Sequence, residues 1–525
     1  MRIRIPDVIS LETDGGTYSG TDRRLASADA CVTCELAGDA LRVNLTGGDT
    51  PLMFVKLTWD FTPSEMRTEP VRVLSDCWER SYGDLAWGSV QPYKLMPWAF
   101  AVSNGTDSAR DVSTRYTECW GVSVRPKAFC AWQYERRGVT LTLDIRCGGA
   151  GVRLMGRELA VCEVKTGEYR CMSAYMALKR FYAGLCSDAL TPEKPVYGSN
   201  NWYYAYGKSS RAQILRDAEL ISRLCAGNQN RPYMVIDAGW SEHWGSAPWD
   251  AGNREFGDMR TLAQEIAARG AIPGIWVRYL SDEDGALKDI PDAWRQKRDR
   301  RYLDPSHPEV LSEVKRITRL LTQEWGYKLI KHDFSCHDMF GDWGFRRPSW
   351  LAEYKESFFD ETRTSAEIAV KLYKTVYESA APGTVILACN APGFLTAGLC
   401  HINRAGDDTS GKSWERTRRM GVNSTAFRFM YDGAFYKADH DCVGVTGQIP
   451  WEKNRKWLEL VSKTGTPLFV SVDPDVPTDA QLSELSEALR RAQTQTDSAV
   501  PLDWMDTCCP ERWLINGEET EYDWR

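Results

Sequence analysis

Eight short apolar runs, separated by segments with helical spacing, constrain the fold of this chain from about residue 195 onward. After the first run, Ile214, Ala218 and Ile221 recur at i, i+4 and i+7, as the buried face of a helix requires. Short strands that alternate with such helices predict βα units and a parallel sheet. Eight units over roughly 195–495 predict a (β/α)8 barrel, within the usual size of that fold.

The eight runs set the expected positions of the barrel strands. In chain order they read VYGSNNWYYAYG, YMVIDAGW, IPGIWVRYL, KLIKHDFS, TVILACNAP, CHINRAGDD, TAFRFMYDG and TPLFVSVD. The seventh strand is therefore expected within residues 425–433, and the last helix over residues 478–493.

The part of the chain before the barrel carries a different pattern. In VTLTLDI, residues 139–145, apolar side chains alternate with polar ones, which is the period of a strand with one buried face. Such segments, separated by Gly-rich turns, predict an antiparallel β-sandwich over residues 1–190. TPEKP at 191–195 marks the boundary. The barrel domain is expected over 191–496, followed by a short β tail over 497–525 that pairs with a sheet elsewhere.

Composition excludes several classes of protein. Hydrophobic residues make up 43% and charged residues 26%, as in a globular protein, and no stretch reaches the roughly 18 apolar residues of a membrane span. A net charge of −7 offers no basic surface for nucleic acid. The 16 cysteines are scattered and are expected to be buried thiols. The amino-terminal residues lack the apolar segment of a secretion signal, so a cytoplasmic location is the default expectation.

Polar residues follow the apolar runs where the strands are expected to end. The run KLIKHDFS, for example, finishes in Lys331, His332 and Asp333. In a (β/α)8 barrel the carboxyl ends of the strands form the active-site face, so these residues are expected to converge there. The same reasoning places the following residues at the ends of strands two, three, five and six: Asp237, Trp240, Trp276, Arg278, Cys389, Asn390, Arg404, Asp407 and Asp408.

Several carboxylates with tryptophans at one face indicate hydrolysis of a glycosidic bond. A retaining mechanism needs two carboxyl groups, of which one is an ionised nucleophile and the other a proton donor. Asp333 is the predicted nucleophile, because Lys331 lies two residues earlier on the same strand face and favours the ionised carboxylate. Asp408 is the predicted acid/base. No cofactor and no metal ion is expected.

An ordered series of motifs in the barrel resembles the α-galactosidase-like enzymes of glycoside hydrolase families 27 and 36. The matching segments are GSNNWYYAYG, YMVIDAGW, FGDMRTLAQEIAARGAIPGIW, YLDPSHPEV, YKLIKHDFS and ACNAPGFLTAGLCHINRAGDDTSGKSW. Such a series is more specific than any single motif. The resemblance also implies a β-sandwich ahead of the barrel, in agreement with the pattern of residues 1–190.

The resemblance implies a role for each matching position. Lys331 and Asp333 correspond to the family's Lys-x-Asp, which makes Asp333 the residue that forms the glycosyl-enzyme ester. Arg404 and Asp408 keep the family's four-residue interval to the acid/base, which favours Asp408 over Asp407. The other implied contacts with the sugar are an apolar wall from Trp202, hydroxyl contacts from Asp237 and Arg404, and contacts near the C2 substituent from Cys389 and Asn390.

Aromatic side chains are plentiful, with 21 tryptophans and 22 tyrosines, which suits stacking on sugars and suits ordinary cores equally. Besides Trp202, the residues Trp240 and Trp276 are candidates for substrate contact. For these two, packing in the core is an equally open alternative.

Ala238 departs from the family pattern. Typical α-galactosidases carry a second aspartate at this position, and the pair of aspartates holds the C4 and C6 hydroxyls that distinguish galactose. Loss of one charged hydrogen-bond partner removes about 1.5–3 kcal/mol of recognition, enough to change substrate preference. The resemblance therefore supports the reaction type better than the identity of the sugar.

Two groups of residues have simpler interpretations. His332, His337 and Asp338 are of metal-binding types, but they lack the helical His-Glu-x-x-His spacing, and strand alternation turns His332 away from the active-site face. A satisfied structural histidine is expected instead. Asp439 and Asp441, in ADHDCVG, are expected to fix a turn rather than line the active-site face.

Three functions remain open. The preferred one is a retaining exo-α-glycosidase that acts on α-galactosides or a related sugar such as α-N-acetylgalactosamine. The segment RAGDD also resembles the raffinose-synthase branch, which implies a transglycosylase. The third is a catalytically silent carbohydrate-binding protein on the same barrel. A carbohydrate is the expected partner in each case, and assembly into a homo-oligomer, as in many relatives, stays open.

Overall fold

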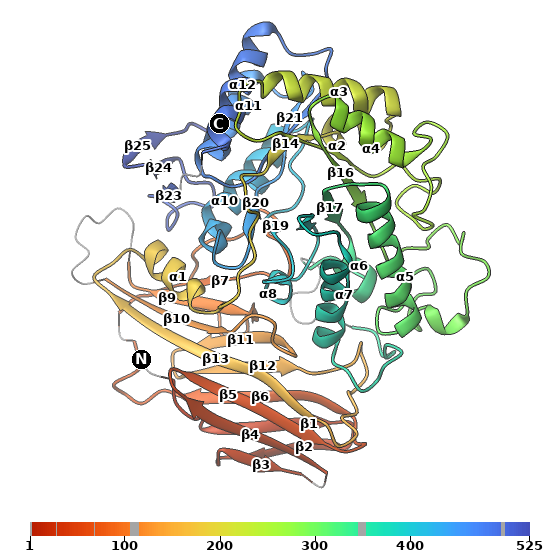
Figure 1. Cartoon of the computed structure of the whole chain (residues 1–525). Helices are drawn as coiled ribbons and strands as arrows, with labels where there is room; N and C mark the ends of the chain where they lie inside the picture. Colours follow the sequence, from red (N-terminus) through yellow and green to blue (C-terminus); the bar gives the residue numbers. More distant parts are fainter. Residues whose placement is uncertain (1–2, 28, 68, 106–114, 345–352, 495–498) are drawn as a thin grey trace.

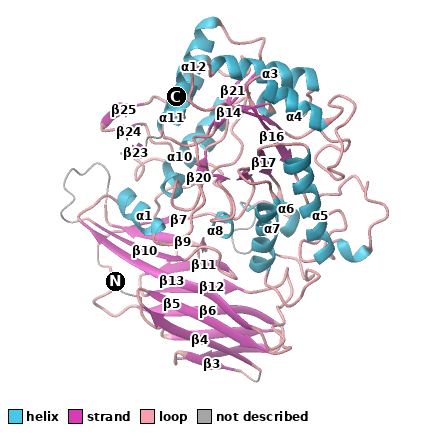
Figure 2. Cartoon of the chain, in the orientation of Figure 1, coloured by secondary structure: helices cyan, strands magenta, loops and turns pink. Residues whose placement is uncertain are grey.

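The computed structural model describes residues 3–27, 29–67, 69–105, 115–344, 353–494 and 499–525. Within these ranges the chain forms a β-sandwich, a barrel of parallel strands and a small C-terminal sheet (Figure 1). Long strands dominate the first part of the chain, and helices gather around the second (Figure 2). The expected fold class, an antiparallel sandwich followed by a (β/α)8-type barrel, is confirmed.

Two antiparallel sheets form the sandwich. In β12 the alternating residues Val139, Leu141 and Leu143 are buried, as the period of two predicts. Rings from the two sheets meet in the core, where the centroids of Trp59 and Trp120 are 5.5 Å apart. The first sheet has the order β2 (Gly16–Gly20), β1 (Val8–Thr13), β6 (Leu52–Asp60), β12 (Gly138–Asp144), β11 (Phe129–Glu135), β8 (Met96–Pro97). The second has the order β3 (Arg24–Ala26), β4 (Ala30–Ala37), β5 (Ala40–Gly47), β13 (Glu158–Arg170), β10 (Tyr116–Val122), β9 (Ala99–Ser103), β7 (Arg72–Ser75).

The barrel sheet is entirely parallel, with the order β20-β19-β18-β17-β16-β15-β14-β22-β21. Its edge strands β20 and β21 are consecutive in the chain, so the short link between them brings the two edges of the curled sheet together. The sheet therefore has eight strand positions, of which the seventh is split in two. The bounds are β14 (Tyr197–Asn200), β15 (Tyr233–Ile236), β16 (Ile272–Val277), β17 (Leu329–His332), β18 (Val385–Ala388), β19 (Ile402–Arg404), β20 (Lys437–Asp439), β21 (Val443–Val445) and β22 (Leu468–Val472).

The prediction of the seventh strand within residues 425–433 is wrong. That segment forms helix α10 (Asn423–Arg428) and the 3₁₀ turn η5 (Phe429–Tyr431), and the strand position belongs to β20 and β21. Every residue from 423 to 431 is buried. Burial on all sides removes the polar face that would have shown a helical period, so a short apolar run of this kind does not distinguish strand from helix.

Helices follow most barrel strands and cover the outside of the sheet (Figures 1 and 2). The predicted face of α3 is buried at Ile214, Ala218 and Ile221. The predicted last helix is α12, which begins after Thr478 with a capping box to Gln481. The bounds are α1 (Ala174–Ala183), α2 (Trp202–Ala205), α3 (Arg211–Leu224), α4 (Met259–Ala268), η1 (Asp292–Trp294), α5 (Pro308–Arg319), η2 (Leu320–Glu324), α6 (Ser335–Phe340), α7 (Ser365–Ser379), α8 (Gly393–Thr396), α9 (Trp414–Thr417), η4 (Arg418–Val422), α11 (Trp451–Lys463) and α12 (Asp479–Ala492).

The C-terminal tail forms an antiparallel sheet of its own, from β23 (Ala499–Pro501), β24 (Arg512–Ile515) and β25 (Glu518–Glu521). The expectation that it pairs with another sheet is therefore wrong. The domain boundary at residue 190 stays a prediction, and the one at residue 496 lies outside the described residues. Over the parts of the chain that the structure describes, no helix has the length and apolar character needed to cross a bilayer.

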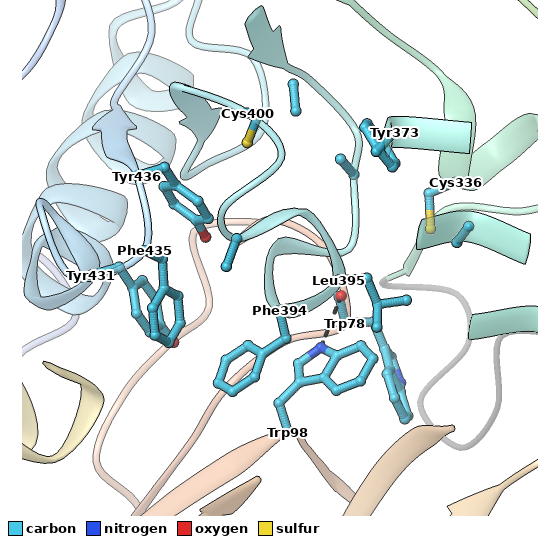
Figure 3. Close-up of a cluster of buried hydrophobic side chains, with 14 of the residues drawn as sticks. Trp78, Trp98, Cys336, Tyr373, Phe394, Leu395, Cys400, Tyr431, Phe435 and Tyr436 are labelled. Atoms are coloured by element: carbon cyan, nitrogen blue, oxygen red, sulfur yellow. Dashed lines mark hydrogen bonds between the residues drawn. The ribbon is translucent and has the colours of Figure 1, made fainter. Parts of the chain in front are cut away.

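An aromatic cluster joins the sandwich to the barrel (Figure 3). The ring of Trp98, between β8 and β9, stacks on Phe394 of α8 with the centroids 5.6 Å apart. The same indole donates its N–H to the carbonyl oxygen of Trp78 at 3.0 Å. All three side chains are buried. The cluster thereby fixes the segment around Trp78 against the barrel.

Candidate active site

Asp333 lies directly after β17. Its backbone amide donates to the carbonyl oxygen of Val277 at 3.0 Å, which continues the pairing of β17 with β16. Its carboxylate accepts the indole N–H of Trp276 at Oδ2 (3.0 Å) and the amide of Phe334 at Oδ1 (2.7 Å). Asp333 is 8% exposed, so the carboxylate is held by two donors and retains a small accessible surface.

Lys331, on β17, forms a buried ion pair beside Asp333. Its Nζ lies 2.7 Å from Oδ2 of Asp237, and the same oxygen accepts from Nδ2 of Asn200 at 2.7 Å. Burial is the largest single influence and opposes the charge on Lys331, but the neighbouring acidic groups, of which Asp237 has the largest effect, together raise the pKa of Lys331 well above its usual value. The charges of Asp333 and Arg404 also act on Lys331. Lys331 is therefore a cation shared by residues at the ends of three strands.

Arg404, the last residue of β19, contacts the candidate acid/base. Its Nη2 lies 2.8 Å from Oδ1 of Asp408 and 2.5 Å from Oδ2 of Asp441. Burial favours the neutral form of Asp408, but Arg404, Arg80 and Lys331 together hold the pKa of Asp408 below its usual value. The arrangement thus favours the carboxylate form of Asp408, the form that a general base requires.

The carboxyl ends of the strands line one cavity. Its walls include Lys331 of β17 and Arg404 of β19, two strands that are separated by β18. The complete lining is Asn200, Val235, Lys331, Leu387, Arg404, Asp439, Asp441, Cys442 and Phe469. Residues far apart in the sequence therefore meet at this face, as the barrel topology requires.

Asp439 and Asp441 do more than fix a turn. Oδ1 of Asp439 does accept the backbone amide of Asp441 at 2.9 Å, but both residues also line the cavity. Oδ2 of Asp441 accepts from the amide of Thr409 (2.8 Å), from the hydroxyl of Thr409 (3.0 Å) and from the hydroxyl of Tyr203. Asp441 thus holds the loop that carries Asp408, a role that the sequence pattern did not reveal.

Asp407 and Asp408 have different surroundings. Asp407 contacts Arg80 through Oδ1 (2.9 Å) and Arg416 through Oδ2 (2.7 Å), and its side chain is 14% exposed. The side chain of Asp408 is 39% exposed, and its closest contact is with Arg404. Because both oxygens of Asp407 already have ion-pair partners, Asp408 is the better placed of the two to exchange a proton with a substrate.

The three candidate tryptophans lie in different places. Trp202 is partly exposed and contacts the rings of Tyr206 and Trp244, at 5.6 and 6.2 Å between centroids, which makes an aromatic wall. Trp276 is buried and acts as a hydrogen-bond donor to Asp333 rather than as a stacking surface. Trp240 is fully buried and donates to the carbonyl oxygen of Trp276 at 2.8 Å, so of its two open alternatives the structure favours packing in the core.

Cys389 and Asn390 follow β18, as predicted, and both are buried. The Cys389 thiol lies 3.7 Å from Nη1 of Arg404, and burial raises its pKa well above the usual value, so it remains a thiol. The amide side chain of Asn390 accepts from the amide of His337 at 3.1 Å and donates to the carboxylate of Glu79. Protein groups therefore already occupy the oxygen and one N–H of the Asn390 amide.

The structure gives no support to a metal site. Among the described residues, no group of three or more His, Cys, Asp or Glu side chains is arranged to hold a metal ion. His332 is buried between the rings of Tyr279 and Tyr373, and within the described ranges neither of its ring nitrogens has a hydrogen-bond partner. His332 therefore packs in the core, as predicted, but its ring nitrogens lack the hydrogen bonds that were expected within the described residues. Asp338 instead forms a buried ion pair with Arg278 at 2.6 Å.

Residues 406–413, GDDTSGKS, match the residue spacing of a phosphate-binding loop. A phosphate-binding loop offers free backbone amides at the start of a helix. Here the amides of Thr409, Ser410 and Gly411 already donate to side-chain oxygens, and the following helix α9 has four residues. The loop therefore lacks the cradle that a phosphate would need.

Two residues of the sandwich domain also reach the site, and neither was predicted from the sequence. Glu79 and Arg80 lie between β7 and β8 and contact Asn390 and Asp407 respectively. A signal was present, because the stretch DCWERSYGD at 76–84 packs charged and aromatic residues into a region otherwise patterned as strands.

No protein-family model matches the sequence. The structure is similar to the α-galactosidase TtGalA from Thermus thermophilus, solved with p-nitrophenyl α-D-galactopyranoside, with a TM-score of 0.61, 17% identity and coverage of 98% of both chains. It is also similar to a single-residue variant of the GH36 α-galactosidase AgaA from Geobacillus stearothermophilus, solved with 1-deoxygalactonojirimycin, with a TM-score of 0.63 and 13% identity over 98% of this chain and 79% of that one.

A further similar structure is the GH36 α-galactosidase AgaB from Geobacillus stearothermophilus, with a TM-score of 0.57 and 11% identity over 93% of this chain and 68% of that one. At such identities the likeness establishes the fold. The likeness to TtGalA covers 98% of both chains, so it includes the sandwich as well as the barrel of this chain.

Proposed function

We propose that the protein is a retaining exo-α-glycosidase that acts on terminal α-galactosides or on a related sugar such as an α-N-acetylgalactosaminide. One observation carries the proposal: Asp333 follows Lys331 of β17, Asp408 binds Arg404 of β19 at 2.8 Å, and Lys331 and Arg404 line the same cavity at the carboxyl ends of the strands. Two carboxyl groups at one site are what double displacement at an anomeric carbon requires. The likeness to solved α-galactosidases supports the choice of sugar class.

In the first step Asp333 is the nucleophile and Asp408 the acid. The reacting form is the fraction of the protein in which Asp408 is protonated. That proton passes to the glycosidic oxygen while Asp333 attacks C1, so the leaving group departs as an alcohol and the sugar remains as an ester of Asp333. The two hydrogen bonds to the Asp333 carboxylate, from Trp276 and from the amide of Phe334, orient it for this attack.

In the second step Asp408 is the base. It takes a proton from water, the water oxygen attacks C1, and the C1–O bond to Asp333 breaks, which releases the sugar and returns both carboxyl groups to their starting state. The cations around Asp408 favour its carboxylate form, which suits this step. An acceptor hydroxyl in place of water gives transglycosylation by the same chemistry.

The test is a panel of nitrophenyl α- and β-glycosides with wild-type protein and Asp333→Asn. We expect cleavage of an α-glycoside, and a loss of more than about 10³-fold in kcat/KM with Asp333→Asn. Asp292→Asn is a matched control, because the side chain of Asp292 is 96% exposed and does not belong to the lining of the cavity. Cleavage by Asp333→Asn at the wild-type rate would contradict the proposal.

Rescue with azide separates the two carboxyl groups. In Asp408→Ala with an activated nitrophenyl substrate, the ester on Asp333 still forms, and azide then gives an α-glycosyl azide without needing a base. In Asp333→Ala, azide attacks C1 of the substrate directly and gives the β-glycosyl azide. The reverse pattern of products would exchange the two assigned roles.

A further inference from the structure

A segment of the β-sandwich is built into the face of the barrel that carries the candidate carboxylates. Ser81 pairs in parallel with Gly406 after β19. The amide of Ser81 donates to the carbonyl oxygen of Ala405 at 3.0 Å, and the amide of Asp407 donates to the carbonyl oxygen of Ser81 at 2.7 Å. This short ladder extends the end of β19 with a strand from another domain, so the segment is held at a fixed register.

Arg80, the residue before Ser81, is buried against the loop after β19. Its Nη2 lies 2.9 Å from Oδ1 of Asp407, and its Nη1 lies 3.9 Å from Oδ1 of Asp408. The ring of Trp343 lies 5.3 Å from the centre of the guanidinium group. At 6% exposure, this cation is too far from water to be a surface charge that merely happens to lie nearby.

Glu79 holds the same segment to the neighbouring loops. Its carboxylate accepts from the side-chain amide of Asn390 after β18, from the amide of Gly344 at 3.2 Å and from the hydroxyl of Tyr82. Consecutive residues of the sandwich therefore contact the loops that follow β17, β18 and β19. The first and third of these loops carry Asp333 and Asp408.

The hydrogen bond that the carboxylate of Asp408 forms within the described residues is on Oδ1. Among the described residues, Arg404 at 2.8 Å and Arg80 at 3.9 Å both approach Oδ1, and no ion pair or hydrogen bond involves Oδ2. Because Arg404 hydrogen-bonds Oδ1 and the charge of Arg80 also lies on the Oδ1 side, the carboxylate is oriented with Oδ2 as the oxygen available for a proton. The other cations that act on Asp408 are Lys331 on β17 and Arg416 on α9. The buried Tyr203 on α2, the adjacent Asp407 and Asp441, which shares Arg404 with Asp408, are further titratable groups near it.

We propose that Arg80 of the β-sandwich is a positioning residue for Asp408, which with Arg404 fixes Oδ1 so that Oδ2 carries the proton to the leaving group. The inference rests on the proposed glycosidase function, because it gives Asp408 the role of acid. It assigns the sandwich domain a part in the reaction. The barrel supplies both carboxylates, and the sandwich orients one of them.

Dependence on the leaving group tests this role. Nitrophenolate leaves with little need for an acid, whereas an alkyl or sugar alcohol needs the proton of Asp408. We expect Arg80→Gln to lower kcat/KM for an alkyl α-glycoside by about 10-fold or more, and that for the nitrophenyl α-glycoside by less than about 3-fold. A merely structural role would lower both equally.

The pH profile gives a second readout. Arg80 favours the carboxylate form of Asp408, so without it the acid stays protonated to higher pH, and the basic limb of kcat/KM moves to higher pH. Arg80→Lys keeps the charge and should keep the limb near its wild-type position. It therefore also serves if Arg80→Gln does not fold. An unmoved limb in Arg80→Gln, with equal losses on both substrates, would overturn the proposal.

Two further variants make the outcomes distinct. Arg416→Gln removes the other partner of Asp407 (2.7 Å) but no direct contact of Asp408, so the ratio between the two substrates should change by less than about 2-fold. In an Asp408→Asn background, Arg80→Gln should have no further effect on that ratio, since it acts through Asp408. An inactive wild type, or an Asp408→Asn variant as active as wild type, would refute the glycosidase function itself. If the wild type is active and the effects of Arg80→Gln and Asp408→Asn on the substrate ratio add in the double variant, only the role of Arg80 would be refuted.

Discussion

The indole N–H of Trp276 donates to Oδ2 of Asp333 across 3.0 Å, so a strand-three residue orients the candidate nucleophile on strand four. Trp276→Phe keeps an aromatic ring but removes this donor. A hydrogen bond to a charged group is worth about 1.5–3 kcal/mol, so we expect kcat to fall by about 10-fold or more while KM changes little. Pre-steady-state measurement of ester formation on Asp333 would locate the loss in the first step.

Trp249→Phe is the matched control for this prediction. Trp249 packs against Trp276 at 5.7 Å between centroids, but its own indole N–H has no hydrogen-bond partner among the described residues. It should therefore reproduce any effect of altered packing and none of the lost hydrogen bond. Equal losses in both variants would show that packing alone explains the effect.

Ala238 provides a test of sugar specificity. It is 4% exposed and follows Asp237, whose carboxylate already accepts from Lys331, Asn200 and the amide of Ala238. If a carboxylate at 238 meets a sugar hydroxyl, Ala238→Asp should improve kcat/KM for an α-galactoside relative to other α-glycosides by about 10-fold, as one charged hydrogen bond allows.

The comparison variant is Ala238→Asn, which has nearly the same shape and no charge. It should give a smaller change in the ratio of kcat/KM values. A uniform loss with every sugar in both variants would instead indicate that position 238 tolerates no larger side chain and does not select the substrate.

The parts of the fold that the sequence predicted are those in which one residue pattern has one structural solution. The alternation in β12 and the spacing of α3 both show which face is buried, and both are confirmed. Residues 425–433 failed because burial on every side removes the contrast between faces. Their helical form depends on the tertiary surroundings and not on a local period.

In the candidate active site, too, the sequence predicted the residues placed by strand order and missed those placed by packing between domains. Lys331 and Arg404 were predicted to meet because parallel strands end at one face, and both line the cavity. Arg80 was missed because its contact with Asp408 joins two domains whose packing has no local sequence pattern. The sequence left Trp240 open between the core and a substrate contact, because a strand end gives a position along the barrel, whereas the direction of the side chain depends on packing against Trp249 and Trp325.

Asp441 should matter for both stability and activity. It pairs with Arg404 and also holds Thr409, next to Asp408, through two hydrogen bonds of 2.8 and 3.0 Å. Asp441→Asn keeps most of the shape but leaves the buried Arg404 with one fewer anion. We expect the free energy of unfolding to fall by about 1–3 kcal/mol and kcat to fall by about 10-fold.

Urea unfolding and steady-state kinetics measure these two effects. Asp439→Asn is the comparison, because Asp439 accepts the amide of Asp441 at 2.9 Å and, within the described chain, forms no hydrogen bond or ion pair with Arg404. It should lower kcat less than Asp441→Asn does. A larger loss with Asp439→Asn would mean that the turn, and not the pairing with Arg404, orders the loop of Asp408.

His332 makes the stability of the fold depend on pH. Burial between Tyr279 and Tyr373 lowers the pKa of His332 to about 3, against about 6.5 in an unfolded chain. At pH values between these two pKa values, the imidazole of His332 is protonated in the unfolded chain and neutral in the folded chain. The contribution of His332 to stability is therefore complete above about pH 6.5 and is lost by up to about 1.4 kcal/mol for each pH unit below it, until pH nears the folded value.

His332→Phe removes this titrating group and should make the free energy of unfolding fall less steeply from pH 6 to pH 4. Tyr279→Phe, which changes a neighbouring ring without removing a group that titrates in this range, should shift the curve and keep its slope. Parallel curves for wild type and His332→Phe would show that the imidazole takes up its proton in the folded state as readily as in the unfolded one.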